Sequence, residues 1–320
     1  MPSFVIESDI DTSLYTIAWI CCNETEYDAA LLMLDKTHGD YAPRRRFCDC
    51  SWYTLGEVCG HNVALVMAFA EQDRVSQIAS LSIDLELLFP NIRVSMIISV
   101  GGGIPSEEHD VRLGDVVVST PDREYGGVVD VDGDYDRRPN ALLPAVELAT
   151  LAVASLLKRE IRTGLGPGDT LKHLTKMKSS KPELETEYAF PGAEKDLLFP
   201  SNYECKRGRG WHSTCAEHDD TSRAIARPTR TDTDPKIHFG TVAACRRVVE
   251  YPLDRDDIKK HTSALAVQVG AEYLMQLRPL VIVGVANYGD SHSDEKWKKY
   301  AAANAAACAK DLVGRFPASR

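Results

Sequence analysis

Short apolar runs rich in β-branched residues recur along this chain and predict a sheet. Runs of about four to eight such residues, bounded by turn-forming residues, are typical of strands. The predicted strands lie at 15–21, 53–60, 62–69, 93–100, 115–119, 237–243 and 281–287. The run over 93–100 leads straight into Gly101-Gly102-Gly103 and is largely apolar, which is typical of a strand covered on both faces of a parallel sheet.

Helical spacing of apolar residues occurs between these runs. The predicted helices lie at 24–34, 75–89 and 144–159, and a last helix runs from Trp297 through an alanine-rich stretch. Strands that alternate with helices predict an α/β fold, in which a central mixed, mostly parallel sheet is flanked by helices on both faces. The alanine-rich helix is expected to pack closely against that sheet.

Residues 160–236 have a different texture from the rest of the chain. They are rich in Lys, Arg, Pro, Gly and Asp, and regular α/β patterning returns only at Ile237. We predict that they form an insertion or lid with one short helix, within a single domain that spans 1–320.

The composition limits the classes of partner that the protein is expected to bind. Of its 320 residues, 44% are hydrophobic and 26% charged, which is ordinary for a globular protein with a buried core. The net charge is −10, whereas a nucleic acid or an anionic membrane requires a basic face, so neither is an expected partner. No apolar run is long enough to cross a bilayer. A small molecule is the predicted partner, and a homo-oligomer is an open alternative to a monomer.

The cysteines do not predict a disulfide framework. There are nine of them, an odd number, and they are scattered along the chain. A reducing, cytoplasmic location is therefore the expectation.

Candidate site residues gather at the ends of predicted strands. Gly101, Gly102 and Gly103 follow the buried strand, and glycine lets a ligand approach the backbone closely. Glu26 lies in the first turn of the helix after the first strand, and Asn287 ends the last strand. Because ligands of α/β sheets bind at the carboxyl ends of the strands, these residues are expected to surround one cavity.

Each of these residues also has a structural alternative. The glycines could form a packed turn, and Glu26 could be a solvated residue that is stabilised by the helix dipole. Asn287 could satisfy backbone groups at the strand end. Asp290, Ser291 and His292 are expected to cap and anchor the following helix rather than to perform chemistry.

Five segments occur in an order and spacing typical of one family. They are 15–21 with Glu26, 53–56 with 60–63, 89–105, 109–119 and 281–313. In this ordered set the chain resembles the fungal nucleoside phosphorylase-like domain of the purine and uridine phosphorylase superfamily. The resemblance covers most of the chain, is weak over 160–236, and implies a three-layer phosphorylase-like α/β fold.

By this resemblance, several parts of the nucleoside chemistry are altered. Asn287 stands where the superfamily has the aspartate that donates a proton to the leaving base, while Glu26 is kept where nucleosidases have the glutamate that activates water. Gln268-Val269-Gly270 replaces the Glu-Met-Glu run that binds ribose. A segment containing Asp73 and Arg74 replaces the glycine-rich phosphate loop. Losing the general acid alone forfeits about 100- to 10,000-fold in rate.

The predicted site therefore has two catalytic residues, Asn287 and Glu26, and a larger binding set. The predicted substrate-binding residues are Gly101, Gly102, Gly103, Asp73, Arg74, Gln268, Val269, Gly270 and Phe239. No cofactor and no metal are predicted. The weak candidates for a metal are Cys205, His212, Cys215 and His218, whose residue types suit zinc but whose spacing is not a usual finger pattern.

Three classes of function fit this set of changes. The favoured hypothesis is a repurposed phosphorylase-fold enzyme that acts on a largely apolar, non-nucleoside molecule, by a cyclisation of the pericyclase or Diels–Alder type in fungal secondary metabolism. Such chemistry depends on holding a reactive conformer and needs no acid. The alternatives are a degenerate nucleoside hydrolase or phosphorylase that uses Glu26, and a non-catalytic ligand-sensing domain.

Overall fold

One mixed sheet forms the centre of the described chain. The structure, a computed structural model, describes residues 10–41, 51–68, 74–131, 146–164, 168–204 and 220–317. The strands are β1 (Ile17–Cys21), β2 (Lys36–Tyr41), β3 (Ser51–Val58), β4 (His61–Ala68), β5 (Val94–Gly103), β6 (Val116–Ser119), β7 (Val128–Asp130), β8 (Ile237–Gly240), β9 (Val242–Cys245), β10 (Ala266–Val269) and β11 (Leu280–Asn287). Six of the seven predicted strands are present as single strands, whereas the one predicted at 237–243 forms two strands, β8 and β9, with different partners.

The central strand, β5, changes neighbours along its length. On one side it pairs with β11 in parallel. On the other side its first half pairs in parallel with β1, up to Ile97, and its end pairs antiparallel with β10, from Gly102. An opening therefore forms beside β5 where β1 has ended and β10 has not yet joined.

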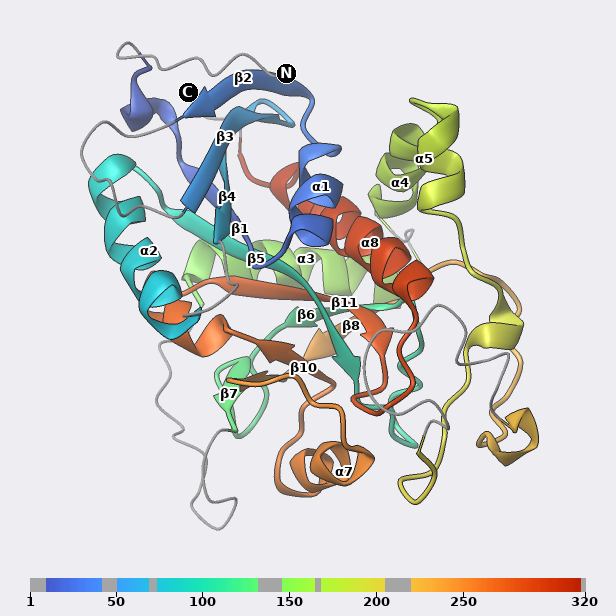
Figure 1. The fold of residues 1–320 in the computed structure, drawn as a ribbon. Helices are drawn as coiled ribbons and strands as arrows, with labels where there is room; N and C mark the ends of the chain where they lie inside the picture. The colour runs from blue at the N-terminus through green and yellow to red at the C-terminus, as the bar shows by residue number, and fades with distance from the viewer. Residues whose placement is uncertain are drawn as a thin grey trace.

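Helices cover both faces of this sheet. The α-helices are α1 (Glu24–Leu31), α2 (Arg74–Leu88), α3 (Leu148–Thr163), α4 (Thr170–Lys178), α5 (Pro182–Glu187), α7 (Pro252–His261) and α8 (Glu295–Val313). Short 3-10 helices are η1 (Thr12–Leu14), η2 (Ala193–Lys195), η3 (Thr221–Arg223) and η4 (Ala271–Leu277). In Figure 1, α1 and α8 lie on one side of the sheet and α2 on the other.

The side chains of the central strands alternate between two cores. Trp19 and Met96 pack in the cluster that contains α1 and α8, whereas Ile20 and Ile97 pack in the cluster that contains α2 and η4. Successive side chains of a strand point to opposite faces, so strands that are covered on both sides must be apolar throughout. This is why the continuous apolar runs in the sequence predicted the strands correctly.

The alanine-rich helix α8 packs closely on β11, as predicted. Its alanines from Ala301 to Ala309 are fully buried. At Gly284, a Cβ would lie only 2.1 Å from the carbonyl oxygen of Ala301. The strand and the helix therefore approach so closely that position 284 must be glycine.

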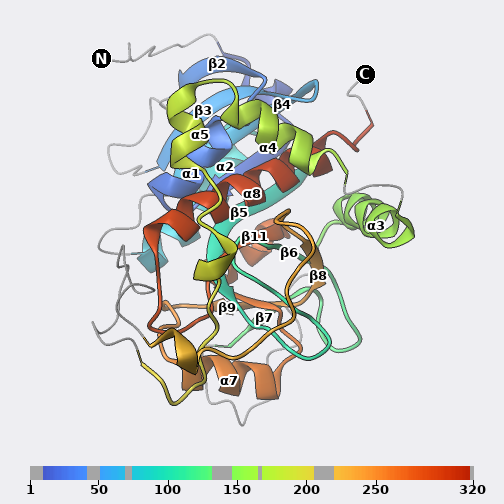
Figure 2. The same ribbon diagram turned by 90° about the vertical axis from the view of Figure 1, so that its right-hand side faces the viewer.

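The structure differs from the prediction in several places. Strand β2 is polar, lies at the edge of the sheet and gave no apolar signal, and β7 is only three residues long. Helix α3 begins at Leu148, four residues later than expected. The single helix predicted for 160–236 is wrong, because α4 and α5 both form there and lie alongside α8 (Figure 2).

No helix in the described ranges is long and apolar enough to cross a membrane.

We predict that Gly284→Ala destabilises the fold by about 1–3 kcal/mol or more, because the added methyl group collides with the backbone of α8. Urea unfolding measures the loss. Gly314→Ala is the control, since Gly314 has a helical φ of −61°. Its Cβ would meet nothing closer than the Cys59 sulfur at 3.3 Å. Equal midpoints for the two variants would show that the contact between β11 and α8 is not tight.

Candidate functional site

A cavity of about 340 Å³ occupies the opening where β1 has parted from β5. It lies at the carboxyl ends of these parallel strands, as expected for a ligand site of an α/β sheet. Its walls are formed by Cys22, Asn23, Glu26, Val100, Gly101, Gly102, Cys245, Val248, Val249, Val267, Gln268, Val269, Asn287 and Lys298. Six of the predicted site residues are therefore brought together here.

Volume alone does not identify this site. A larger cavity, of about 710 Å³, lies at the opposite ends of the strands, beside Ile17 and Val94. None of the sequence-predicted site residues lines it. The smaller cavity combines the expected end of the sheet with a buried carboxyl group, so it is the stronger candidate.

Glu26 completes the hydrogen bonding of the sheet at the opening. One carboxylate oxygen accepts the backbone N–H of Val100 at 2.9 Å, and the other accepts the N–H of Cys22 at 2.8 Å. Its own N–H is bound by the side chain of Asn23, which caps α1. Glu26 is only 2% exposed. The alternative of a solvated helical residue is therefore wrong.

Burial raises the pKa of Glu26 from 4.5 to about 7. The two backbone hydrogen bonds and the charge of Lys298 act in the opposite direction but do not compensate for the loss of water. Near neutral pH the carboxyl group is thus divided between its two protonation states. A group of this kind can accept or donate a proton.

Asn287 faces the same cavity from the end of β11. Its side-chain oxygen accepts the N–H of Gly289 at 2.8 Å, which fixes the orientation of the amide. Because the oxygen must face that donor, the amide nitrogen is the end that remains for a ligand. The position is 94% buried, so its donors are not lost to bulk water.

Glycine is required where the strands crowd the cavity. A Cβ at Gly101 would lie 2.1 Å from the carbonyl oxygen of Val267, and one at Gly102 would lie 2.9 Å from the side-chain oxygen of Asn287. Gly103 pairs with Ala266 and does not line the cavity. The triplet thus serves close packing of β5, and two of its members also form the cavity wall.

Both ends of the Gln268 side chain are hydrogen-bonded to neighbouring backbone groups. Its oxygen accepts the N–H of Ala271 at 2.9 Å, and its nitrogen donates to the carbonyl of Val269 at 2.6 Å. Gly270 has a φ of +99° at the start of η4 and does not line the cavity. This segment therefore forms a turn, and it presents no carboxylate to a ligand.

Of the remaining predicted residues, Phe239 is described and does not line the cavity. Phe239 lies on β8, which pairs with β6, and the amine of Lys158 lies 5.9 Å above its ring. Arg74 begins α2, and its side chain lies outside what the structure describes. The predicted residues outside the described ranges are Asp73, Cys205, His212, Cys215 and His218.

Several lining residues were not predicted from the sequence. Cys22 and Asn23 directly follow β1, so their place after a strand was a usable signal. Cys245 ends β9, so its place at a strand end was a usable signal as well. Lys298 gave no such signal, because it comes from helix α8. Both cysteines carry no disulfide. Within the described ranges, no group of His, Cys, Asp or Glu side chains is arranged to hold a metal ion.

The N-cap of the following helix is Asp294 and not Asp290, Ser291 or His292, which were expected to cap it. Asp290 accepts the N–H of His292 at 2.9 Å, and Asp294 caps α8 by accepting the N–H of Lys296 at 2.8 Å. The ring of His292 stacks on that of Phe199, with centroids 4.2 Å apart. These residues thus fix the course of the chain between the cavity and α8.

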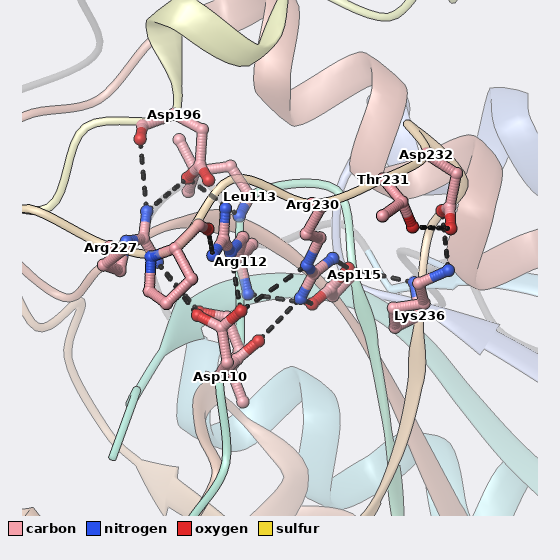
Figure 3. Close-up of polar contacts among 12 residues, drawn as sticks. Asp110, Arg112, Leu113, Asp115, Asp196, Arg227, Arg230, Thr231, Asp232 and Lys236 are labelled. Atoms are coloured by element: carbon pink, nitrogen blue, oxygen red, sulfur yellow. Dashed lines mark hydrogen bonds and ion pairs between the residues drawn. The ribbon is translucent and has the colours of Figure 1, made fainter. Parts of the chain in front are cut away.

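A buried carboxylate, Asp115, anchors the end of the segment 160–236 that was predicted to be an insertion or lid. Asp115, just before β6, accepts from both terminal nitrogens of Arg230 at 2.7 Å (Figure 3). It also accepts from the ring of His238 at 2.8 Å. Burial alone raises the pKa of Asp115, but these hydrogen bonds outweigh it and hold the pKa below the usual value. The segment before β8 is therefore attached firmly to the sheet.

Comparison with other proteins agrees with this fold. No family model matches the chain. It is 33% identical over 306 residues to a protein of Hyaloscypha variabilis named nucleotide-binding leucine-rich repeat (NLR)-like protein. The match covers 93% of this chain but 29% of that protein, so the chain spans less than a third of its relative's length.

Solved structures share the architecture. A 5′-methylthioadenosine/S-adenosylhomocysteine nucleosidase from Neisseria meningitidis, in complex with methylthio-immucillin-A, matches with a TM-score of 0.57 and 16% identity, over 95% of this chain and 100% of that one. Futalosine hydrolase of Helicobacter pylori matches with a TM-score of 0.58 and 10% identity, over 95% and 99%.

A third match is an aspartate-to-asparagine variant of the Helicobacter pylori nucleosidase, with 5′-methylthioadenosine in its active site. It has a TM-score of 0.57 and 12% identity, over 94% of this chain and 99% of that one. Together these structures confirm the predicted α/β fold of the nucleosidase and phosphorylase type.

We predict a pH dependence of stability that belongs to Glu26. Its folded-state pKa of about 7 exceeds its ordinary value of 4.5, so the folded protein binds the proton more tightly than the unfolded chain. The free energy of unfolding should therefore fall as the pH rises through this window, by about 1.4 kcal/mol per pH unit, and level off above it.

Thermal unfolding of the wild type and Glu26→Gln between pH 4 and pH 9, about the span of both values, measures this decline. The part of the decline that belongs to Glu26 should be absent in the variant, because glutamine does not titrate. The absolute stability of the variant should be lower, since an amide nitrogen cannot accept one of the two backbone N–H groups. Parallel pH profiles would show that Glu26 has an ordinary pKa.

Proposed function

We propose that the cavity between Glu26 and Asn287 binds a small molecule and does not cleave the glycosidic bond of a nucleoside. The observation that carries this proposal is the amide of Asn287, whose oxygen is held by Gly289 and whose N–H donors remain for a ligand. An amide donates hydrogen bonds but does not release its proton to a leaving base.

The engagement of Gln268 supports the same conclusion. Ribose hydroxyl groups would need acceptors on this wall, but both ends of the Gln268 side chain are used within the turn before η4. The positioning that makes a bound reaction fast is therefore reduced as well as the acid chemistry.

The walls define the chemistry of the occupant. Valines form the apolar part, namely Val100, Val248, Val249, Val267 and Val269. The polar part is the Asn287 amide on one side and Glu26 with Lys298 on the other. The ligand thus has an apolar body and, opposite Asn287, a hydrogen-bond acceptor such as a carbonyl oxygen or an unprotonated ring nitrogen.

A ligand-sensing role is the function that we favour for this cavity. The relative from Hyaloscypha variabilis carries the name of an NLR-like protein, and this chain corresponds to 29% of it. There the similar region is one part of a longer protein, in which binding without turnover can serve as a signal. The nucleosidase variant that holds 5′-methylthioadenosine supports the idea that this fold retains ligands after an aspartate is replaced by asparagine.

A cyclisation is the second candidate, and the valine wall is the observation that favours it. An apolar cavity can hold a flexible substrate in a reactive conformer, and a donor such as Asn287 can polarise a carbonyl group of that substrate. An enzyme of this kind, in fungal secondary metabolism, would use Glu26 only to shape the wall.

We predict that the purified protein releases no base from inosine, adenosine or 5′-methylthioadenosine, with or without phosphate. The reason is that neither position 287 nor position 268 carries a carboxyl group. Chromatographic detection of free base is the measurement, and a nucleosidase of the same fold is the positive control. Sustained base release that disappears in Glu26→Gln would replace this proposal with the hydrolytic alternative.

We predict further that Asn287→Ala weakens binding of 5′-methylthioadenosine about tenfold, because one hydrogen bond from a buried donor is lost. Titration calorimetry measures the dissociation constant. Asn91→Ala is the matched control, since its exposed amide donates to the Ser13 carbonyl outside the cavity. Equal losses in both variants would place the ligand elsewhere, and turnover of an apolar polyene by the wild type would favour cyclisation.

A further inference from the structure

The turn that follows Asn287 has a second support outside the cavity. Gly289, with a φ of +60°, bends the chain back so that its N–H reaches the side-chain oxygen of Asn287. The carbonyl of Tyr288, between them, points out of the turn and accepts from a guanidinium nitrogen of Arg255 at 3.2 Å. Arg255 thus supports this turn through the backbone carbonyl of Tyr288.

Arg255 comes from α7, the helix that follows the cavity-lining residues Val248 and Val249. Its side chain is only 7% exposed. The aliphatic part of its side chain packs near Gly289: a Cβ added at Gly289 would lie 3.5 Å from the Cβ of Arg255. The guanidinium also lies 2.9 Å from the exposed carboxylate of Asp256 and 3.8 Å from the buried carboxylate of Asp290. Arg255 therefore contacts the turn at the carbonyl of Tyr288, beside Gly289 and near the carboxylate of Asp290.

The same guanidinium also contacts the segment that follows η2. It donates to the hydroxyl of Ser201 at 3.4 Å, and that hydroxyl donates in turn to Asp256. On its other side the turn is held by Tyr288, whose hydroxyl is bound to Asp196 and whose ring lies 5.1 Å from the guanidinium of Arg227. Two arginines thus hold the residue that follows Asn287, one through its backbone and one through its ring.

We propose that Arg255 is the positioning residue of this site: it fixes the turn 287–290 and thereby aims the amide of Asn287 into the cavity. The inference rests on the proposed function, because it assumes that the amide of Asn287 is what a ligand contacts. Arg255 does not line the cavity, so its effect on a ligand passes through the turn.

The geometry explains why lysine cannot replace this arginine fully. A planar guanidinium contacts the Tyr288 carbonyl, Ser201 and Asp256 at once, whereas an ammonium group is a compact charge on a flexible stem. Arg255→Lys keeps the positive charge near the buried carboxylate of Asp290 but loses the planar group that donates in several directions at once. Arg255→Ala removes both, and it leaves that carboxylate without its cation.

Amide hydrogen exchange in the unliganded protein tests the positioning role directly. In Arg255→Lys, exchange of the Gly289 N–H should rise about tenfold, because its hydrogen bond to Asn287 opens more often. Exchange over the preceding strand residues 280–284 should not change, and the melting temperature should stay close to that of the wild type. Arg247→Ala is the matched control, since the side chain of that arginine is 77% exposed.

A general structural role would give another result. If Arg255 only stabilised the fold, exchange would rise over β11 and the other core strands together, and the melting temperature would fall in proportion. Unchanged exchange at Gly289 in both Arg255→Lys and Arg255→Ala would overturn the proposal. Should Arg255→Ala fail to fold, the Arg255→Lys result decides alone.

Binding of 5′-methylthioadenosine separates this inference from the proposed function. If the wild type binds it, Arg255→Lys should raise the dissociation constant by about three- to tenfold, and Arg247→Ala should leave it unchanged. In the double variant with Asn287→Ala, the Arg255 substitution should have no further effect, because the group that it aims is missing. If the wild type does not bind this probe, the choice of nucleoside fails, while the exchange at Gly289 still decides the role of Arg255.

Discussion

The change of neighbours along β5 is the constraint from which the candidate site follows. A buried strand cannot leave its N–H and carbonyl groups without partners. Between Ile97, where pairing with β1 stops, and Gly102, where pairing with β10 begins, the N–H of Val100 is satisfied by the carboxylate of Glu26. The opening, the buried acid and the glycine wall are consequences of this one exchange of partners.

This arrangement places opposite demands on Glu26. Completing the sheet requires an acceptor, which favours the carboxylate, whereas burial favours the neutral acid, and the balance raises its pKa to about 7. The residue is thus explained by structure before any chemistry is considered. A structural acceptor and a proton-transferring group can be the same side chain, so its presence at the cavity does not by itself indicate catalysis.

Asn287 lies on the cavity wall opposite Glu26, and its amide N–H groups are what it offers to a ligand. Its oxygen is committed to the turn at Gly289, and Arg255 and Tyr288 hold that turn from two directions. A cavity wall held this firmly, yet without a carboxyl group at position 287, is better suited to hold a ligand in one pose than to protonate a leaving group. Both proposed roles, sensing and cyclisation, need only that pose.

The sequence by itself determined the layers of the fold and the end of the sheet that carries the site. Apolar periodicity reports local burial, so the covered strands and the alanine-rich helix were predictable, as was the meeting of Glu26, Gly101, Gly102 and Asn287 at the carboxyl ends. Polar β2 was not, because an edge strand needs no apolar face. Only the tertiary structure decided that the Gln268 side chain is used within its own turn, that Phe239 lies elsewhere, and that Lys298 lines the cavity. It alone also placed Arg255 against the turn after Asn287. Those outcomes depend on contacts between segments far apart in the chain, and no local pattern records them.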